Sequence, residues 1–140
     1  MASLALHSMA LLARNSDRLL TAGEIARTVG ASEAHLAKAM QRLVKAGLAR
    51  SERGPRGGFA LARPADTITL LEIYEAIEGP RTVETCPLGR STCAFPGCLF
   101  GGVLEALEDK VYEYLGSTRL SEAAMAQSPP VWHGKPPEAR

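Results

Sequence analysis

The chain has 140 residues, of which 46% are hydrophobic and 22% are charged, a balance typical of one soluble globular domain. No apolar run approaches the ~20 residues that a membrane-spanning helix needs, and the apolar stretch at residues 2–13 lacks the basic start of a signal peptide. Three cysteines, an odd number confined to residues 86–98, argue against a disulfide framework and favour a reducing, cytoplasmic location.

The net charge of +1 conceals an asymmetry along the chain. Residues 1–63 contain ten Lys/Arg and four Asp/Glu, a net charge of +6, whereas residues 64–140 contain six Lys/Arg and eleven Asp/Glu, a net charge of −5. A basic half joined to an acidic half is typical of a protein that contacts a polyanion. The alternative is a chance distribution of solvated charges. The order of the helices and strands along the chain distinguishes between these two interpretations.

Three helices are expected in the basic half. The first, at residues 2–14, is apolar nearly all round and should be buried on more than one side. The second begins at the capping box Thr21–Glu24 and ends at Gly30. Ser32 caps a third helix that runs to about Ala46. This third helix has two stripes, an apolar one at Leu36, Met40, Leu43 and Val44, and a cationic one at His35, Lys38, Arg42 and Lys45.

Two short strands follow the third helix, at residues 48–52 and 59–62. The turn between them contains Arg53 and Arg56 among three glycines. A hairpin with a basic tip directly after a helix-turn-helix is the wing of a winged helix, whose arginines suit the narrow minor groove of DNA. The alternatives, a solvated helix face and a solvated loop, are less consistent with this order of elements.

The acidic half begins with a second capping box, Thr69–Glu72, which opens a helix that ends at Gly79. A loop of about twenty residues, long for a compact domain, then holds the cysteines. Beyond Gly102, a helix carries an apolar seam at spacings of three, four and three residues: Leu104, Leu107, Val111 and Tyr114. This seam favours a homodimer, although it is short enough to be ordinary core packing.

The expected fold is therefore mainly α with a small β-hairpin wing, a winged helix-turn-helix followed by a long dimerisation helix. Residues 1–66 form the expected DNA-binding domain, and residues 67–126 hold the cysteine loop and the dimerisation helix. Residues 127–140 contain four of the nine prolines and no apolar periodicity, which predicts a disordered tail.

The cysteines are spaced C-x6-C-x4-C at Cys86, Cys93 and Cys98. Three soft thiolates in one loop can surround a single metal centre. Free or redox-active thiols and a zinc site are the alternatives, although no C-x-x-C pair is present. An enzyme with a cysteine nucleophile is disfavoured, because no motif places a histidine base beside a thiol.

The residues from Ser32 to Leu48, followed by ARSERGPRGGF at 49–59, resemble the signature of the Rrf2 family of bacterial winged-helix transcription regulators. The family pattern is S-x-x-x-L, then L-x-x-x-G-L, then S-x-R-G-x-x-G-G-Y/F, and the resemblance spans about residues 3–125. It implies a homodimeric regulator that binds a double-stranded DNA operator. Its IscR- and NsrR-like members hold a 2Fe–2S or 4Fe–4S cluster that senses redox state, nitric oxide or iron–sulfur status. The alternative is a cofactor-free member, which senses oxidants through its thiols or binds a metabolic partner protein.

The resemblance also implies site residues. DNA contacts fall on Ser32, Ala34, His35, Ala37 and Lys38 of the helix and on Arg53 and Arg56 of the wing. Metal ligands fall on Cys86, Cys93, Cys98 and His7.

The chain departs from the family pattern at several of these positions. IscR-like members have a glutamate at the position of Ala37 and a ligating histidine at the position of Gly101. Ser3 stands where other members place an acidic fourth ligand, and His7, one helical turn later, matches a histidine ligand of a two-iron member. A partly buried histidine in the dimer core is the alternative for His7.

Overall fold

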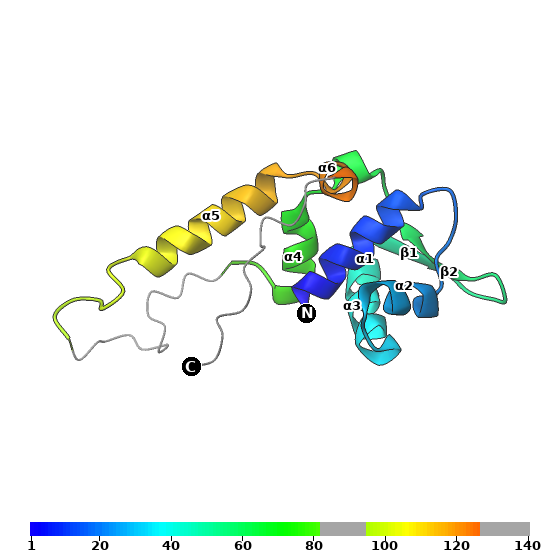
Figure 1. Cartoon of the computed structure of the whole chain (residues 1–140), viewed down its shortest axis with the longest axis horizontal. Helices are drawn as coiled ribbons and strands as arrows, with labels where there is room; N and C mark the ends of the chain where they lie inside the picture. Colours follow the sequence, from blue (N-terminus) through cyan, green and yellow to red (C-terminus); the bar gives the residue numbers. More distant parts are fainter. Residues whose placement is uncertain (82–94, 127–140) are drawn as a thin grey trace, which may run out of the picture.

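The computed structural model of the chain describes residues 1–81 and 95–126. It is mainly helical with one antiparallel hairpin, which confirms the expected fold class (Figure 1). The elements in chain order are α1 (Ala2–Arg14), α2 (Ala22–Val29), α3 (Glu33–Lys45), β1 (Ala49–Glu52), β2 (Gly58–Leu61), the 3-10 helix η1 (Ala65–Thr67), α4 (Leu70–Glu78), α5 (Val103–Ser117) and α6 (Leu120–Met125).

Side chains close the starts of α2 and α4 as the sequence predicts. The hydroxyl oxygens of Thr21 and Thr69 accept the backbone N–H groups of Glu24 and Glu72, and the two glutamates accept the threonine N–H groups in return. Each box satisfies donors that a helix start leaves unpaired. Between α2 and α3, Gly30 adopts φ 69°, the left-handed conformation that ends α2 and sets the turn of the helix-turn-helix.

The core is built around α1, which crosses the middle of the molecule (Figure 1). One face of α1 is buried through Ala5, Met9 and Leu12, and it packs against α3, α4 and α6. From α3, Leu36, Met40 and Leu43 are fully buried, whereas the fourth residue of the expected apolar stripe, Val44, is half-buried. The same core continues into α4 and α6 through Ile73, Ile77 and Leu120. The winged helix and the later helices thus share one packed interior.

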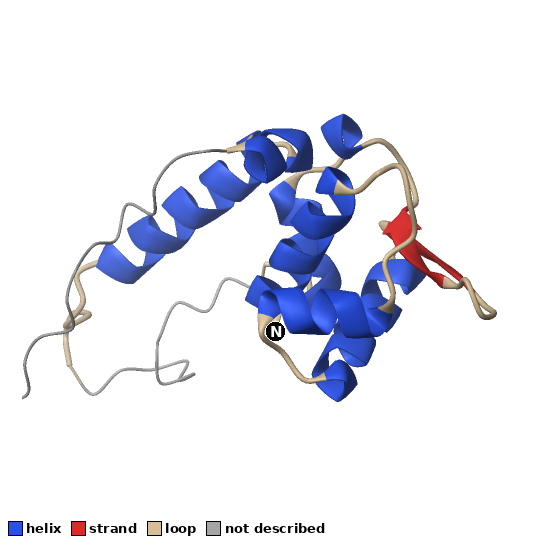
Figure 2. Cartoon of the chain, turned by 45° about the vertical axis from the view of Figure 1, so that its right-hand side comes forward, coloured by secondary structure: helices blue, strands red, loops and turns tan. Residues whose placement is uncertain are grey.

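The hairpin projects from the body, with β1 in contact with α3 and β2 in contact with α1 (Figures 1 and 2). Its register pairs Ala49 with Leu61 and Ser51 with Phe59. Phe59 also pairs with Leu20 before α2, with N–O distances of 2.8 and 3.0 Å in the two directions. At Gly58 a Cβ atom would lie only 2.6 Å from the Leu20 carbonyl oxygen, so glycine is required for this approach. The start of β2, next to the turn of the wing, is therefore fixed to the segment that precedes α2.

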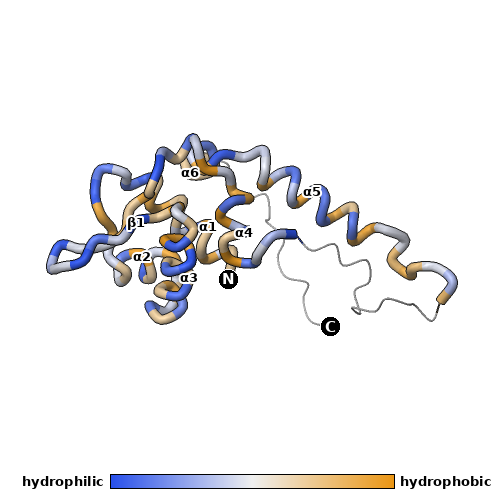
Figure 3. The backbone as a smooth tube through the Cα atoms, turned by 180° about the vertical axis from the view of Figure 1, so that it is seen from behind, coloured by the Kyte–Doolittle hydropathy of each residue, from blue (hydrophilic) through white to orange (hydrophobic). Residues whose placement is uncertain are grey.

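The long helix α5 leaves the body, with its C-terminal end on α4 (Figures 1 and 3). There Leu115 is buried, and the Tyr112 ring meets the Tyr74 ring edge-on at a centroid distance of 5.9 Å. The chain then turns into α6, a helix that the sequence did not predict. The predicted tail at 127–140 lies outside the described residues. No helix within the described ranges is long and apolar enough to cross a membrane.

Candidate nucleic-acid interface and cysteine segment

The outer face of α3 is formed by residues that point away from the core. Ala34, Lys38, Gln41 and Lys45 are all exposed and recur every three or four residues, opposite the buried Leu36 and Leu43. Ala37 is also exposed, at the side of this line. Gln41 is absent from the sequence-based site, although its position seven residues after Ala34 would have placed it on this face.

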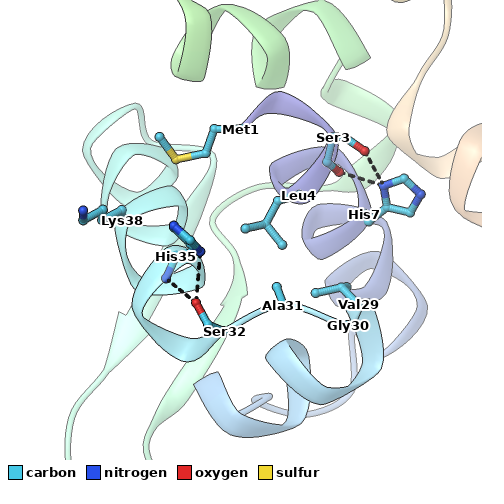
Figure 4. Close-up of a pocket in the computed structure, with 10 residues that line it drawn as sticks. All are labelled: Met1, Ser3, Leu4, His7, Val29, Gly30, Ala31, Ser32, His35 and Lys38. Carbon is cyan, nitrogen blue, oxygen red and sulfur yellow. Dashed lines mark hydrogen bonds between the residues drawn. The ribbon is translucent and has the colours of Figure 1, made fainter.

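Ser32 and His35 lie together at the start of α3. The Ser32 hydroxyl accepts the His35 backbone N–H at 3.3 Å and lies 3.0 Å from the Nδ1 atom of the His35 ring (Figure 4). They border a cavity of about 830 Å³ between α1, the α2–α3 turn and α3. Its lining consists of Met1, Ser3, Leu4, His7, Val29, Gly30, Ala31, Ser32, His35 and Lys38. The sequence-predicted residues Ser32, His35, Lys38 and His7 therefore all border one hollow.

Arg42 behaves differently from the other cations of α3. The sequence places it on the cationic stripe with Lys38 and Lys45, but its guanidinium Nη1 donates a 2.6 Å hydrogen bond to the carbonyl oxygen of Ile77 at the end of α4. Ile77 is 35 positions after Arg42 in the sequence, so the periodicity of α3 could not reveal the contact. Among the described residues, the cations of the α3 outer face that have no ion-pair partner are therefore Lys38 and Lys45.

The wing tip carries Arg53 and Arg56, both exposed. Gly54 adopts φ 115° between them, a conformation that glycine reaches readily and that lets the tip turn tightly. On β1, Arg50 is paired with Glu52. Among the described residues neither tip arginine has an ion-pair partner. Within the described residues, the hairpin thus presents two positive charges without an ion-pair partner at its tip.

The cysteine segment lies only partly within the described residues. Cys86 and Cys93 fall outside them, and Cys98 has an exposed thiol. The segment 95–102 lies at the far end of α5, away from α1, in both views of the molecule (Figures 1 and 2). One chain therefore does not bring Cys98 and His7 together. Within residues 1–81 and 95–126, no group of three or more His, Cys, Asp and Glu side chains is placed to hold a metal ion.

His7 is exposed on α1 rather than partly buried within the chain. Its Nδ1 atom lies 2.7 Å from the carbonyl oxygen of Ser3, which also lines the cavity (Figure 4). Because a carbonyl oxygen can only accept a hydrogen bond, Nδ1 carries the proton in the neutral ring. In this tautomer the lone pair lies on Nε2, which has no hydrogen-bond partner among the described residues, and the Ser3 carbonyl orients the ring.

The predicted seam of α5 is exposed in the single chain. Leu107 is 58% exposed, Val111 50% and Tyr114 61%. Phe95, Leu99 and Phe100 in the segment before α5 are exposed as well. These apolar side chains therefore remain uncovered by the part of the chain that the structure describes.

Comparison with known proteins accounts for this combination of features. A family model described as "Rrf2: Iron-dependent Transcriptional regulator" matches residues 1–125. The chain is 33% identical over 126 residues to the HTH-type transcriptional regulator IscR of Cereibacter sphaeroides, covering 86% of this chain and 80% of IscR. It is 30% identical over 134 residues to the HTH-type transcriptional repressor NsrR of Streptomyces coelicolor, covering 94% and 90%.

The fold agrees with these sequence relatives. The solved structure of CymR, the global cysteine regulator of B. subtilis, matches with a TM-score of 0.69 at 29% identity, covering 88% of this chain and 92% of CymR. These relatives are transcription regulators rather than enzymes, as the sequence led us to expect. The hairpin is thus the wing of a DNA-binding winged helix, and the chain belongs to the Rrf2 family of transcriptional regulators.

Proposed function

We propose that the chain acts as a homodimeric repressor whose operator affinity is controlled by an iron–sulfur cluster, of the 2Fe–2S or 4Fe–4S type, that senses redox state, nitric oxide or iron–sulfur status. The observation that carries the DNA-binding part is the joint exposure of two cationic surfaces, the outer face of α3 and the wing tip. The wing is fixed to the segment before α2 through Leu20 and Phe59. Both surfaces therefore approach DNA as one unit.

In this proposal α3 enters the major groove and the wing lies along the minor groove. Lys38 and Ala34 face base edges, where a lysine reads guanine acceptors and an alanine contacts a thymine methyl group. Ser32 and His35 border the cavity at the start of α3 and lie at the DNA backbone. Arg53 and Arg56 enter the minor groove. Ala37 cannot accept a hydrogen bond from a base, so the operator differs from that of members with a glutamate there.

The donor set suits an iron–sulfur cluster. Cys86, Cys93 and Cys98 supply three thiolates, the usual ligands of such clusters, and the family description specifies iron dependence. His7 supplies the fourth ligand through its Nε2 atom. Because α1 and the segment 95–102 lie apart in one chain (Figure 1), this histidine comes from the partner subunit. When bound, the cluster supplies a centre whose charge and integrity respond to redox state and nitric oxide.

A second candidate is a regulator without a cofactor, which senses oxidants through its thiols or binds a metabolic partner protein. The exposed thiol of Cys98 favours it, together with the structural likeness to CymR, a global cysteine regulator. The two candidates share the same DNA-binding surface and differ in what the cysteines hold.

Anaerobic expression with cluster-assembly machinery tests the cluster. We expect visible absorption with iron and sulfide at about two or four atoms each per chain. Substitution of any one cysteine by serine, such as Cys98→Ser, should abolish or greatly destabilise the cluster, because a serine oxygen is a harder and poorer iron ligand. His7→Ala should still assemble a cluster, with a shifted potential or greater lability, while His35→Ala serves as the matched histidine control.

The outcomes separate the candidates. Iron-free wild-type protein would exclude the cluster and leave the thiol sensor, which is then tested by operator affinity in oxidised and reduced forms. A His7→Ala protein with an unaltered spectrum and stability would exclude only the fourth-ligand assignment.

A further inference from the structure

Residues 77–81, here called the junction, connect the end of α4 to the cysteine segment and contact three other helices. The Ile77 carbonyl oxygen accepts the Arg42 guanidinium of α3 at 2.6 Å. A Glu78 carboxylate oxygen accepts the Ala2 backbone N–H of α1 at 3.0 Å. Arg81 Nη1 pairs with the Asp109 carboxylate of α5 at 2.7 Å. Within five residues the chain is therefore bound to α3, α1 and α5.

The contact with α3 is made at a helix end. The last carbonyl groups of an α-helix have no partner inside it and carry the negative end of its dipole. Arg42 satisfies one of them with a charged donor, and such hydrogen bonds are about twice as strong as neutral ones. The side chain of Ile77 is also buried, at 4% exposure, so the α4 end is packed as well as bonded. A displacement of this end would therefore act on the C-terminal part of α3 through the Arg42 side chain.

The ion-paired contact with α5 is made by Arg81. Besides Asp109, its guanidinium lies 3.7 Å from a Glu108 carboxylate oxygen and 5.1 Å from the Tyr112 ring centroid. Tyr112 in turn packs edge-on against Tyr74 of α4. Arg81 is the last described residue before the cysteine segment, and α5 is the first helix after it. The residue that precedes the segment is thus held against the middle of the helix that follows it.

We propose that the junction links the cysteine segment to the recognition helix, and that Arg42 is a positioning residue of α3 rather than a DNA contact. This inference rests on the proposed sensing function. A rearrangement of the cysteine segment displaces Arg81 and α5. The end of α4 moves with Arg81, and the hydrogen bond from Arg42 to the Ile77 carbonyl transmits this displacement to α3. The tilt of α3 then differs between the two states of the segment, and operator affinity differs with it.

The test uses the ratio of operator affinities of the cluster-loaded and cluster-stripped full-length protein. A protein without a cluster is tested with its thiols reduced and oxidised instead. We expect a wild-type ratio of about 5–150 in either direction, and a ratio close to one for Arg42→Met and for Arg81→Met. The double variant should show no further loss, because two residues in one linkage are not additive. Arg42→Lys, which keeps one charged donor, should recover part of the ratio.

Lys45→Met is the matched control, because it removes a cation from the same helix without touching α4. It should weaken both forms equally, reduce the salt slope of binding by about one unit, and keep the ratio. Arg42→Met should keep the salt slope. A wild-type ratio of one would overturn both the sensing function and the linkage. A wild-type ratio of affinities in Arg42→Met would overturn the linkage alone. Arg42→Gln replaces this variant if the methionine protein does not fold. If the salt slope of binding is also lower in that variant, Arg42 contacts a DNA phosphate instead.

Discussion

At the scale of single residues, the capping glutamates both have a pKa below the ordinary value of a glutamate. Glu24 accepts the Thr21 backbone N–H at 2.8 Å and the Arg18 guanidinium at 3.0 Å, and these two contacts lower its pKa to about 2. At Glu72, burial alone would raise the pKa, but the Thr69 backbone N–H and the Arg63 guanidinium outweigh it and leave the pKa below its ordinary value. Both capping boxes are therefore strongest when the carboxylate is ionised.

Because the pKa of each capping glutamate is lower in the folded than in the unfolded chain, the stability of the fold depends on pH in a defined direction. A carboxylate whose pKa is lower in the folded state stabilises the fold above its unfolded pKa, and this contribution is lost as the pH falls. For Glu24 the loss runs from about 4.5 down to about 2. We expect Glu24→Gln to lower the melting temperature at pH 7, with the difference from wild type narrowing across this window. Thermal unfolding between pH 7 and pH 2 measures it.

Glu33→Gln is the control for this prediction, because Glu33 is an exposed glutamate in the first turn of α3 that does not close a capping box. A Glu24→Gln melting curve displaced by the same amount at every pH would contradict the assignment to the capping box.

At the scale of elements, local signals predicted the helices that their own sequences define. Thr21 with Glu24 and Thr69 with Glu72 mark two helix starts because the partners lie three residues apart. By contrast, α6 depends on distant pairing, since Leu120 donates its backbone N–H to Ile68 and Leu70 donates to Thr118. The Arg42 contact with Ile77 spans 35 residues and has no local pattern. Elements and contacts of this second kind could not be foreseen from sequence.

The wing provides a prediction at this scale. Arg53→Ala and Arg56→Ala should each weaken binding to operator and random DNA alike, and reduce the salt slope by about one unit, because each loses a phosphate contact. Arg50→Ala is the control, since Glu52 already pairs with that charge.

On the recognition helix, Lys38→Ala should instead change base preference at one operator position, by about 1–3 kcal/mol. Fluorescence anisotropy across a salt series measures these effects, and an unchanged slope for both wing variants would argue against a wing that contacts DNA.

At the scale of the whole molecule, the exposed seam of α5 requires a second copy in our proposal. The sequence predicted the seam from the spacing of Leu104, Leu107, Val111 and Tyr114, but it could not show whether the same chain covers it. Within residues 1–81 and 95–126 nothing covers the middle of the seam, because Leu107, Val111 and Tyr114 are at least half exposed while Leu115, toward the body, is buried. The positions of Cys86 and Cys93 lie outside the described residues, so the ligand set stays a prediction.

We expect Leu107→Asp and Val111→Asp to give monomers or aggregates, because a charge buried at an apolar interface has no partner. Glu105→Lys, which changes a charge on the outward side of α5, should leave the assembly intact. Sedimentation velocity at micromolar concentration measures the oligomeric state. Wild-type protein that sediments as a monomer under these conditions would refute the proposed dimer.

The close approach of Gly58 to Leu20 also defines what can be exchanged between relatives in a designed chimera. A hairpin transplanted by itself would arrive without the loop whose backbone it pairs with, since Phe59 and Leu20 share two hydrogen bonds. Even a single methyl group at Gly58 would collide with the Leu20 carbonyl oxygen, at 2.6 Å. A transplanted wing should therefore carry with it the loop before α2, including Leu20.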